Sequence, residues 1–198
     1  IMSLRSEKHC GGLRFYEAGY KWDHSVGPQT RTRQLWSVGS TSGGKYVSVK
    51  TGDLGTQSEV TVTASGESDS NSDTIDIKCV KYSSPLDTTK TVQPWFYLMF
   101  SSGQNDYNVT ASESGVKASD QTNSGTIFRL FSLYSPNDSY IVLQSNQNSG
   151  DDPLYLSSNG AGKMKLKVWN SPVPRPPRTS DEVDPALLFR LVRPLEKI

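Results

Sequence analysis

The strongest constraint on the fold is a strict alternation near the end of the chain. Residues 163–169 read Lys-Met-Lys-Leu-Lys-Val-Trp, so a lysine occupies every second position. Successive side chains of a β-strand point to opposite faces of the sheet. A strand with this sequence turns its lysines to water and Met164, Leu166 and Val168 to a core. We therefore expect a half-buried antiparallel strand here.

The residues that precede this strand continue the pattern. Strand-like runs at 127–133, 140–143 and 153–156 are separated by turn sequences, of which Ser-Pro-Asn-Asp at 135–138 is the clearest. A polar loop is expected between 144 and 153. The whole stretch from 126 to 169 predicts a β-meander.

Similar short runs continue along the chain from residue 34. No stretch has a convincing helical period, so we expect an all-β protein with about twelve strands and little helix. The predicted strands cover 34–38, 45–50, 58–64, 74–82, 94–101, 107–111, 115–118, 126–134, 140–144, 153–157, 163–169 and 186–193.

A hydrophobic run followed roughly ten residues later by a tyrosine occurs three times. The three copies are 35–38 before Tyr46, 96–100 before Tyr107, and 128–131 before Tyr140. Residues 189–191, Phe-Arg-Leu, repeat the sequence at 128–130 and end the series. Three hairpins of similar design, with a last strand that returns to the first, predict a β-trefoil, a barrel capped by three hairpins.

We divide the 198 residues into two parts. Residues 1–32 form an N-terminal arm that either contributes a strand or stays mobile, and residues 33–198 form a single β-trefoil domain. The loop at 171–184 has four prolines and two arginines. A stiff loop of this length is either a functional element or a tolerated insertion.

The sequence carries no sign of catalysis or of a cofactor. The only histidines, His9 and His24, lie in the arm, and no cysteine or histidine spacing suits a metal. We expect no enzyme activity, no catalytic residue, no cofactor and no metal. Cys10 and Cys79 are expected to be thiols, although one disulfide between them stays open.

Charge and hydropathy limit the partners. Lys plus Arg is 21 and Asp plus Glu is 20, which gives no bulk charge for nucleic acid. No apolar run approaches the roughly 20 residues that span a bilayer, so no membrane insertion is expected. The candidate partner-binding residues are Lys163, Lys165, Lys167, Arg175 and Arg178. The lysine ladder either protects a strand edge or binds an acidic protein or a sulfated glycan.

Residues 132–142, Ser-Leu-Tyr-Ser-Pro-Asn-Asp-Ser-Tyr-Ile-Val, resemble the hairpin signature of the interleukin-1 cytokine family. Residues 152–156 resemble the late Pro-hydrophobic strand of that family. The runs at 163–169 and 187–191 are similar to the last two strands of its interleukin-18 and interleukin-33 branch, and residues 74–81 resemble a strand of interleukin-18. Pro136 and Tyr140 are separated by one residue more than in the family signature.

This resemblance implies a monomeric cytokine that is released without a leader and binds immunoglobulin-domain receptors outside the cell. Tyr20-Lys21-Trp22-Asp23 is similar to an inflammatory-caspase site, which makes Asp23 a candidate processing site. Asn108 and Asn137 begin glycosylation sequons, which matter in the secretory pathway.

Three other functions share the predicted fold. A carbohydrate-binding lectin is the first alternative, although Trp36, Trp95 and Trp169 lie within runs and are expected in the core. A Kunitz-type protease inhibitor would use the loop with Arg175 and Arg178 as its reactive loop. A fascin-like module is the last, although such modules occur in tandem.

Overall fold

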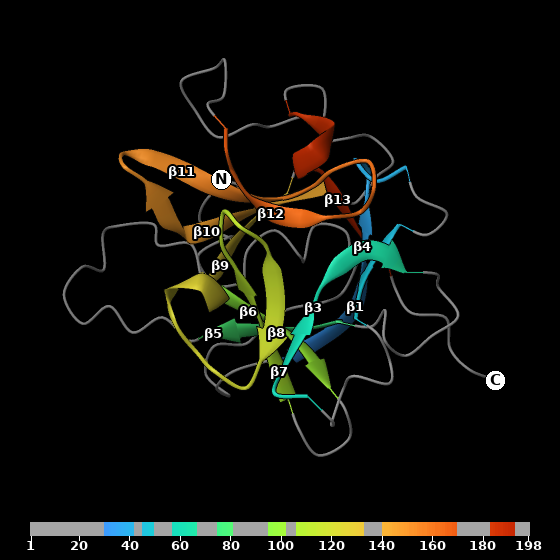
Figure 1. The fold of residues 1–198 in the computed structure, drawn as a ribbon, viewed down its shortest axis with the longest axis vertical. Helices are drawn as coiled ribbons and strands as arrows, with labels where there is room; N and C mark the ends of the chain where they lie inside the picture. The colour runs from blue at the N-terminus through green and yellow to red at the C-terminus, as the bar shows by residue number, and fades with distance from the viewer. Residues whose placement is uncertain are drawn as a thin grey trace, which may run out of the picture.

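The structure is a computed structural model that describes residues 30–41, 45–49, 57–66, 75–80, 95–101, 106–132, 140–169 and 183–192. Within these ranges the protein is all-β with little helix, as predicted, and it has thirteen strands, where about twelve were expected, and two short 3₁₀ helices (Figure 1). The strands are β1 (Thr30–Ser37), β2 (Tyr46–Ser48), β3 (Glu59–Thr61), β4 (Thr63–Gly66), β5 (Ile75–Val80), β6 (Trp95–Ser101), β7 (Asp106–Ala111), β8 (Val116–Ser119), β9 (Phe128–Ser132), β10 (Tyr140–Ser149), β11 (Asp152–Ser158), β12 (Met164–Val168) and β13 (Phe189–Val192). The helices are η5 (Ser124–Thr126) and η7 (Pro185–Leu187).

Six of the strands close into a barrel. In order around the ring they are β1, β13, β10, β9, β6 and β5, and β5 pairs with β1 to complete the circle. Every pair is antiparallel. Because a closed ring has no edge strand, its backbone groups are satisfied within the barrel.

Three hairpins cap this barrel. They are β2–β4, β7–β8 and β11–β12, and Figure 1 looks down onto them, with β12, β8 and β4 arranged around the centre of the view. Three backbone hydrogen bonds join each hairpin to the other two, from Val62 N to Val116 O, from Leu166 N to Ser112 O, and from Ala64 N to Gly162 O. A closed six-stranded barrel with three mutually bonded hairpins is a β-trefoil, so the predicted architecture is confirmed.

Most predicted strands lie within a few residues of their observed positions, with three differences. The run at 58–64 is divided into β3 and β4. β1 begins at Thr30, so the last residues of the predicted arm belong to the barrel. The predicted polar loop after 144 is wrong, because β10 continues to Ser149 and pairs with β11 beyond a bulge. The turn between the two strands contains Gly150, whose φ is 62°. It is shorter than the loop that the polar composition predicts.

The number of predicted repeats is correct, but the third copy is out of phase by one strand. The first two predicted copies are β1–β2 and β6–β7, which are equivalent positions in their repeats. The third predicted copy is β9–β10, which joins the second repeat to the third, and its true equivalent is β10–β11. A hydrophobic run followed by a tyrosine marks an antiparallel pair wherever it falls in a repeat.

A single large core fills the barrel and the space beneath the hairpins. The inward side chains of alternate strand positions supply it, including the fully buried Phe96, Phe100, Phe128 and Phe189. A second, smaller cluster lies on the outside of β10 and β11, where the segment at 183–188 covers them; its buried members are Val142, Tyr155, Val183, Leu187 and Leu188. The second cluster fixes η7 beside the third hairpin.

Candidate ligand pocket on the third hairpin

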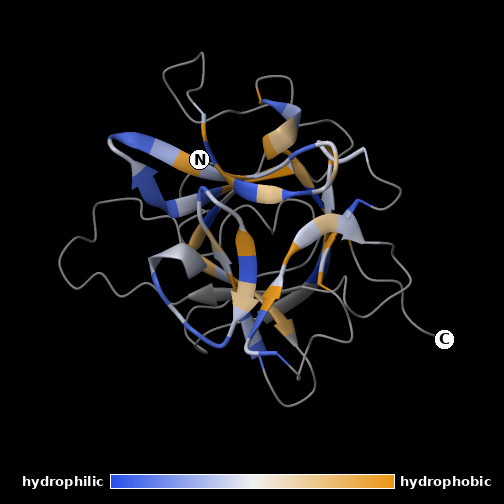
Figure 2. Ribbon diagram, viewed as in Figure 1, coloured by the Kyte–Doolittle hydropathy of each residue, from blue (hydrophilic) through white to orange (hydrophobic). Residues whose placement is uncertain are grey.

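The third hairpin, β11–β12, carries the lysine ladder that the sequence predicts. Lys163, Lys165 and Lys167 are exposed, whereas Met164 and Leu166 are 2% and 1% exposed and belong to the main core. Figure 2 shows hydrophilic and hydrophobic residues alternating along β12 and along β8. The predicted alternation is therefore confirmed.

The three lysines line an open pocket of about 330 Å³ on the outer side of this hairpin. We call it the lysine pocket. Its other lining residues come from the end of β11, from the turn and from η7, and they are Ser157, Ser158, Asn159 and Ala186. The structure thus gathers one predicted group of partner-binding residues around a cavity.

The turn between β11 and β12 is held by one asparagine and one glycine. The Asn159 Oδ1 accepts a hydrogen bond from Lys163 N at 2.9 Å, and Gly162 N donates to Asn159 O at 3.0 Å. Gly162 has a φ of 86°, and a Cβ there would lie 2.8 Å from Ala64 O. This position therefore requires glycine, both for its backbone conformation and for its close approach to β4.

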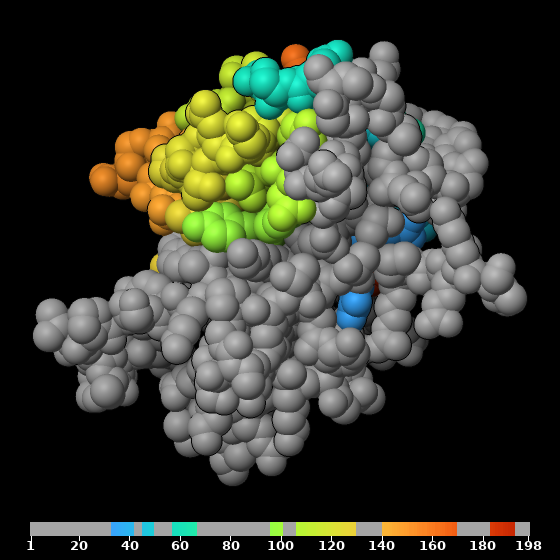
Figure 3. All heavy atoms as spheres, turned by 90° about the horizontal axis from the view of Figure 1, so that it is seen from below, coloured from blue at the N-terminus to red at the C-terminus, as the bar shows by residue number. Residues whose placement is uncertain are grey.

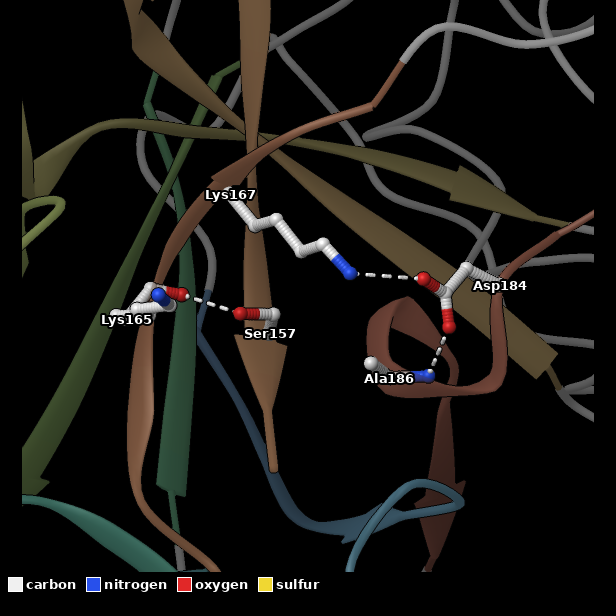
Figure 4. Close-up of polar contacts among 5 residues, drawn as sticks. All are labelled: Ser157, Lys165, Lys167, Asp184 and Ala186. Carbon is white, nitrogen blue, oxygen red and sulfur yellow. Dashed lines mark hydrogen bonds and ion pairs between the residues drawn. The ribbon is translucent and has the colours of Figure 1, made fainter. Parts of the chain in front are cut away.

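One end of the lysine pocket is neutralised by Asp184, which caps η7 (Figure 4). Its Oδ1 accepts from Ala186 N at 3.0 Å, and its Oδ2 lies 3.0 Å from Lys167 Nζ. The hydrogen bond from Ala186 is the main cause that lowers the pKa of Asp184 from 3.8; partial burial opposes it and Lys167 adds to it. Among the described residues, Lys163 and Lys165 have no carboxylate partner.

Close packing holds η7 against the hairpin. Gly39 makes this packing possible, because a Cβ there would lie 2.8 Å from the Ala186 Cα and 2.9 Å from the Ser158 O. The Val38 N donates to Leu188 O at 3.0 Å, which ties the segment to the end of β1. The wall that carries Asp184 is thus fixed by buried contacts on its other side.

A second surface lies on the outside of the barrel, where Tyr46, Trp36, Arg190 and Tyr140 sit side by side. The register pairs Trp36 with Tyr46 and with Arg190, and Arg190 with Tyr140. The Arg190 Cζ lies 6.0 Å from the Trp36 ring centroid and 5.7 Å from that of Tyr140. All four side chains are half-buried. We call these four residues the aromatic row.

The expectation that the tryptophans lie in the core is wrong for Trp36, whereas Trp169 packs against the second cluster. Trp36 is half-buried in the aromatic row, and Trp169 is half-buried against Tyr155, with ring centroids 5.7 Å apart. The side chain of Trp95 lies outside the described part of the chain. Hydrophobicity places a residue in a strand but does not choose between its two faces when both are covered.

Several predicted site residues lie outside the described ranges, namely Asp23, Asn137, Arg175 and Arg178. Asn108 lies in β7, where its Nδ2 donates to Gln121 O at 3.4 Å and to Thr122 Oγ1 at 3.3 Å. The segment around η5 lies against β7, and Figure 3 shows these residues side by side on one face. The Asn108 sequon is therefore in a paired strand, and its glycosylation stays a prediction.

The described ranges contain no group of three or more His, Cys, Asp or Glu residues that could hold a metal ion. No helix within them is long and apolar enough to cross a bilayer. The absence of enzyme activity and of a cofactor stays a prediction.

Sequence reasoning found the lysines but missed the other walls of the pocket. Asp184 followed by Pro185 is a signal for the start of a short helix, and it could have marked the cap. Asn159 followed by Gly160 similarly marks the turn. No local signal shows that η7 lies beside β12, because that contact spans 17 positions and depends on tertiary packing.

No protein-family model and no curated protein sequence matches the chain. A solved structure described as "Crystal structure of HCR/D W1238A mutant" is similar in fold, with a TM-score of 0.49 and 9% identity, over 84% of this chain and 42% of that one. This chain therefore spans less than half the length of that relative. The likeness says nothing about function, and the β-trefoil architecture rests on the closed strand pairing alone.

Proposed function

We propose that this protein is a non-enzymatic receptor ligand of the interleukin-1 type, which binds an immunoglobulin-domain ectodomain outside the cell through the aromatic row. In this proposal it acts as a monomer in the extracellular space. The resemblance at residues 132–142 supplies the receptor class.

The aromatic row is the observation that supports the proposal. Tryptophan, tyrosine and arginine are the residues most enriched where binding energy concentrates in protein interfaces. Trp36, Arg190 and Tyr140 lie on three adjacent strands of a closed barrel, so their positions are fixed before a partner arrives. A partly exposed row of this composition suits a protein surface that buries about 800 Å² on each side.

Binding of the purified chain to a panel of interleukin-1-type receptor ectodomains, measured by surface plasmon resonance, tests the proposal. We expect Trp36→Ala to weaken binding by at least about tenfold, because truncating a central anchor costs about 2 kcal/mol. Tyr97→Ala is the matched control, since Tyr97 is a half-buried aromatic on another strand, β6. Absence of binding to every ectodomain would remove the proposal.

Carbohydrate binding is the second candidate, and the lysine pocket favours it. A volume of about 330 Å³ is within the range of small-ligand sites. A glycan array separates the two candidates, because a receptor ligand that has no lectin function leaves the array blank.

A further inference from the structure

We infer that the lysine pocket binds a sulfate or phosphate ester carried on a sugar-sized ring. This inference rests on the second candidate function, carbohydrate binding, and names the chemical class of its ligand. It does not depend on the receptor proposal, which concerns a different surface.

The charges at the lysine pocket favour an anion. Lys163 and Lys165 have no carboxylate partner among the described residues, whereas Lys167 is paired with Asp184. Alternate residues of a strand lie about 6.6 Å apart along it and on one face. Lys163 and Lys165 both line the pocket, so both long side chains can reach one anionic ligand in it. Two unbalanced like charges beside each other destabilise the empty pocket, and a bound anion relieves that repulsion.

The type of cation favours an ester oxyanion over a carboxylate. Lysine presents a compact charge with three donors and no planar fork, whereas arginine pairs with carboxylates in a bidentate manner. Tetrahedral sulfate and phosphate groups accept hydrogen bonds in several directions and suit such point charges. The described lining of the pocket contains three lysines and no arginine.

The uncharged lining suits the ring that carries the ester. Asn159 uses its Oδ1 to accept from Lys163 N, so its Nδ2 can donate to a ligand. The Ser157 hydroxyl donates to Lys165 O at 2.9 Å and keeps a lone pair that can accept from a sugar hydroxyl (Figure 4). These groups give a saccharide the mixture of donors and acceptors that its hydroxyls require.

The test is isothermal titration calorimetry of the full chain with three ligands: a heparin-derived tetrasaccharide, its desulfated counterpart and inositol hexakisphosphate. We expect the sulfated sugar or the inositol phosphate to bind and the desulfated sugar to bind at least about tenfold more weakly. A preference between the first two identifies the source of the ester as a sulfated glycan or a phosphorylated small molecule.

Three variants locate the site. We expect the double variant Lys163→Gln, Lys165→Gln to lose at least about tenfold in affinity, because it removes both unpaired charges. Lys117→Gln is the matched control, since Lys117 is an exposed lysine of the second hairpin, and it should change affinity less than about twofold. Asp184→Asn should strengthen binding by about threefold, because it releases Lys167. Circular dichroism checks that each variant is folded.

Each contrary result has a definite meaning. Equal binding of sulfated and desulfated sugars overturns the inference and keeps carbohydrate binding. Binding of no sugar and no inositol phosphate overturns both. Tighter binding of a polyglutamate peptide, or wild-type affinity in the double lysine variant, also overturns the inference.

Discussion

The second and third hairpins, β7–β8 and β11–β12, occupy equivalent places in the trefoil but differ in charge balance. Both bury alternate residues under the cap and expose lysines between them. In the second hairpin Lys117 is paired with Glu59 of the neighbouring strand β3. In the third, only Lys167 has a partner among the described residues.

Strand pairing explains this difference. β8 pairs with β3 over three residues, and Glu59 of β3 lies diagonally from Lys117, two residues before Thr61, which is directly opposite the lysine. β12 pairs with β11 alone, apart from a single bridge between Thr63 and Lys163. The fold requires the inward residues of both hairpins. It does not require that Lys163 and Lys165 of the third hairpin lack a carboxylate partner.

The residues that cap the two 3₁₀ helices, η5 before β9 and η7 before β13, make the same point. Asn123 caps η5 by accepting from Gly125 N at 2.8 Å, and Asp184 caps η7 by accepting from Ala186 N at 3.0 Å. Asparagine and aspartate are equally good caps. The negative charge at 184 is therefore not needed for capping; it strengthens the hydrogen bond from Ala186 N and pairs with Lys167.

The largest expected effect comes from the inward face of the third hairpin. Leu166→Ala should lower the free energy of unfolding by about 2–5 kcal/mol, because it leaves a cavity in the main core. The neighbouring Lys165→Ala should change it by less than about 0.5 kcal/mol. Urea denaturation measures both, and similar losses in the two variants would contradict the division of β12 into a core face and a ligand face.

The two hairpin turns provide the next comparison. Gly162→Ala should cost about 1–3 kcal/mol, since it strains a φ of 86° and brings a Cβ against Ala64 O. Gly115→Ala in the second hairpin should be nearly neutral, because nothing lies within 4 Å of its Cβ position. Thermal denaturation compares them. Equal stability of the two variants would show that the third turn is not fixed as described.

Periodicity predicted most of the fold because strand alternation is a local property. The inward and outward residues of β12 follow from spacing alone, and all twelve predicted runs contain strand. The phase of the repeats could not be predicted this way, since pairing around the barrel is decided by distant contacts. The position of Trp36 was missed for a related reason, because both faces of β1 are covered and its neighbours Gln34 and Ser37 are buried as well.

The candidate site was predictable in one part only. The lysine ladder is visible in the sequence, but the pocket also needs η7, which reaches β12 through the second cluster on the outside of the barrel. Gly39, whose missing side chain permits that approach, carries no local signal of the contact.

A smaller effect is expected when the balance of the second hairpin is removed. Glu59→Gln releases Lys117 and should change the free energy of unfolding by less than about 1 kcal/mol, because both side chains are largely exposed. It should give no gain in affinity for the sulfated tetrasaccharide, since Lys117 does not line the lysine pocket. A gain measured by calorimetry would show that an unpaired lysine suffices and that the pocket contributes nothing.

The smallest expected effect is the pH dependence that Asp184 contributes. Its pKa in the folded chain is lower than 3.8, so the unfolded chain binds the proton more readily in the acid range. The stabilisation is therefore complete above 3.8 and is lost as the pH falls through the folded pKa. Thermal denaturation of wild type and Asp184→Asn across this range measures it. The difference between the two proteins should shrink on acidification, because protonation removes the charge that strengthens the hydrogen bond from Ala186 N and the ion pair with Lys167, and the variant already lacks this charge. A difference that stays constant would mean that the charge of Asp184 does not stabilise the fold. Asp184 would then contribute only as a helix cap, a role that asparagine fills equally well.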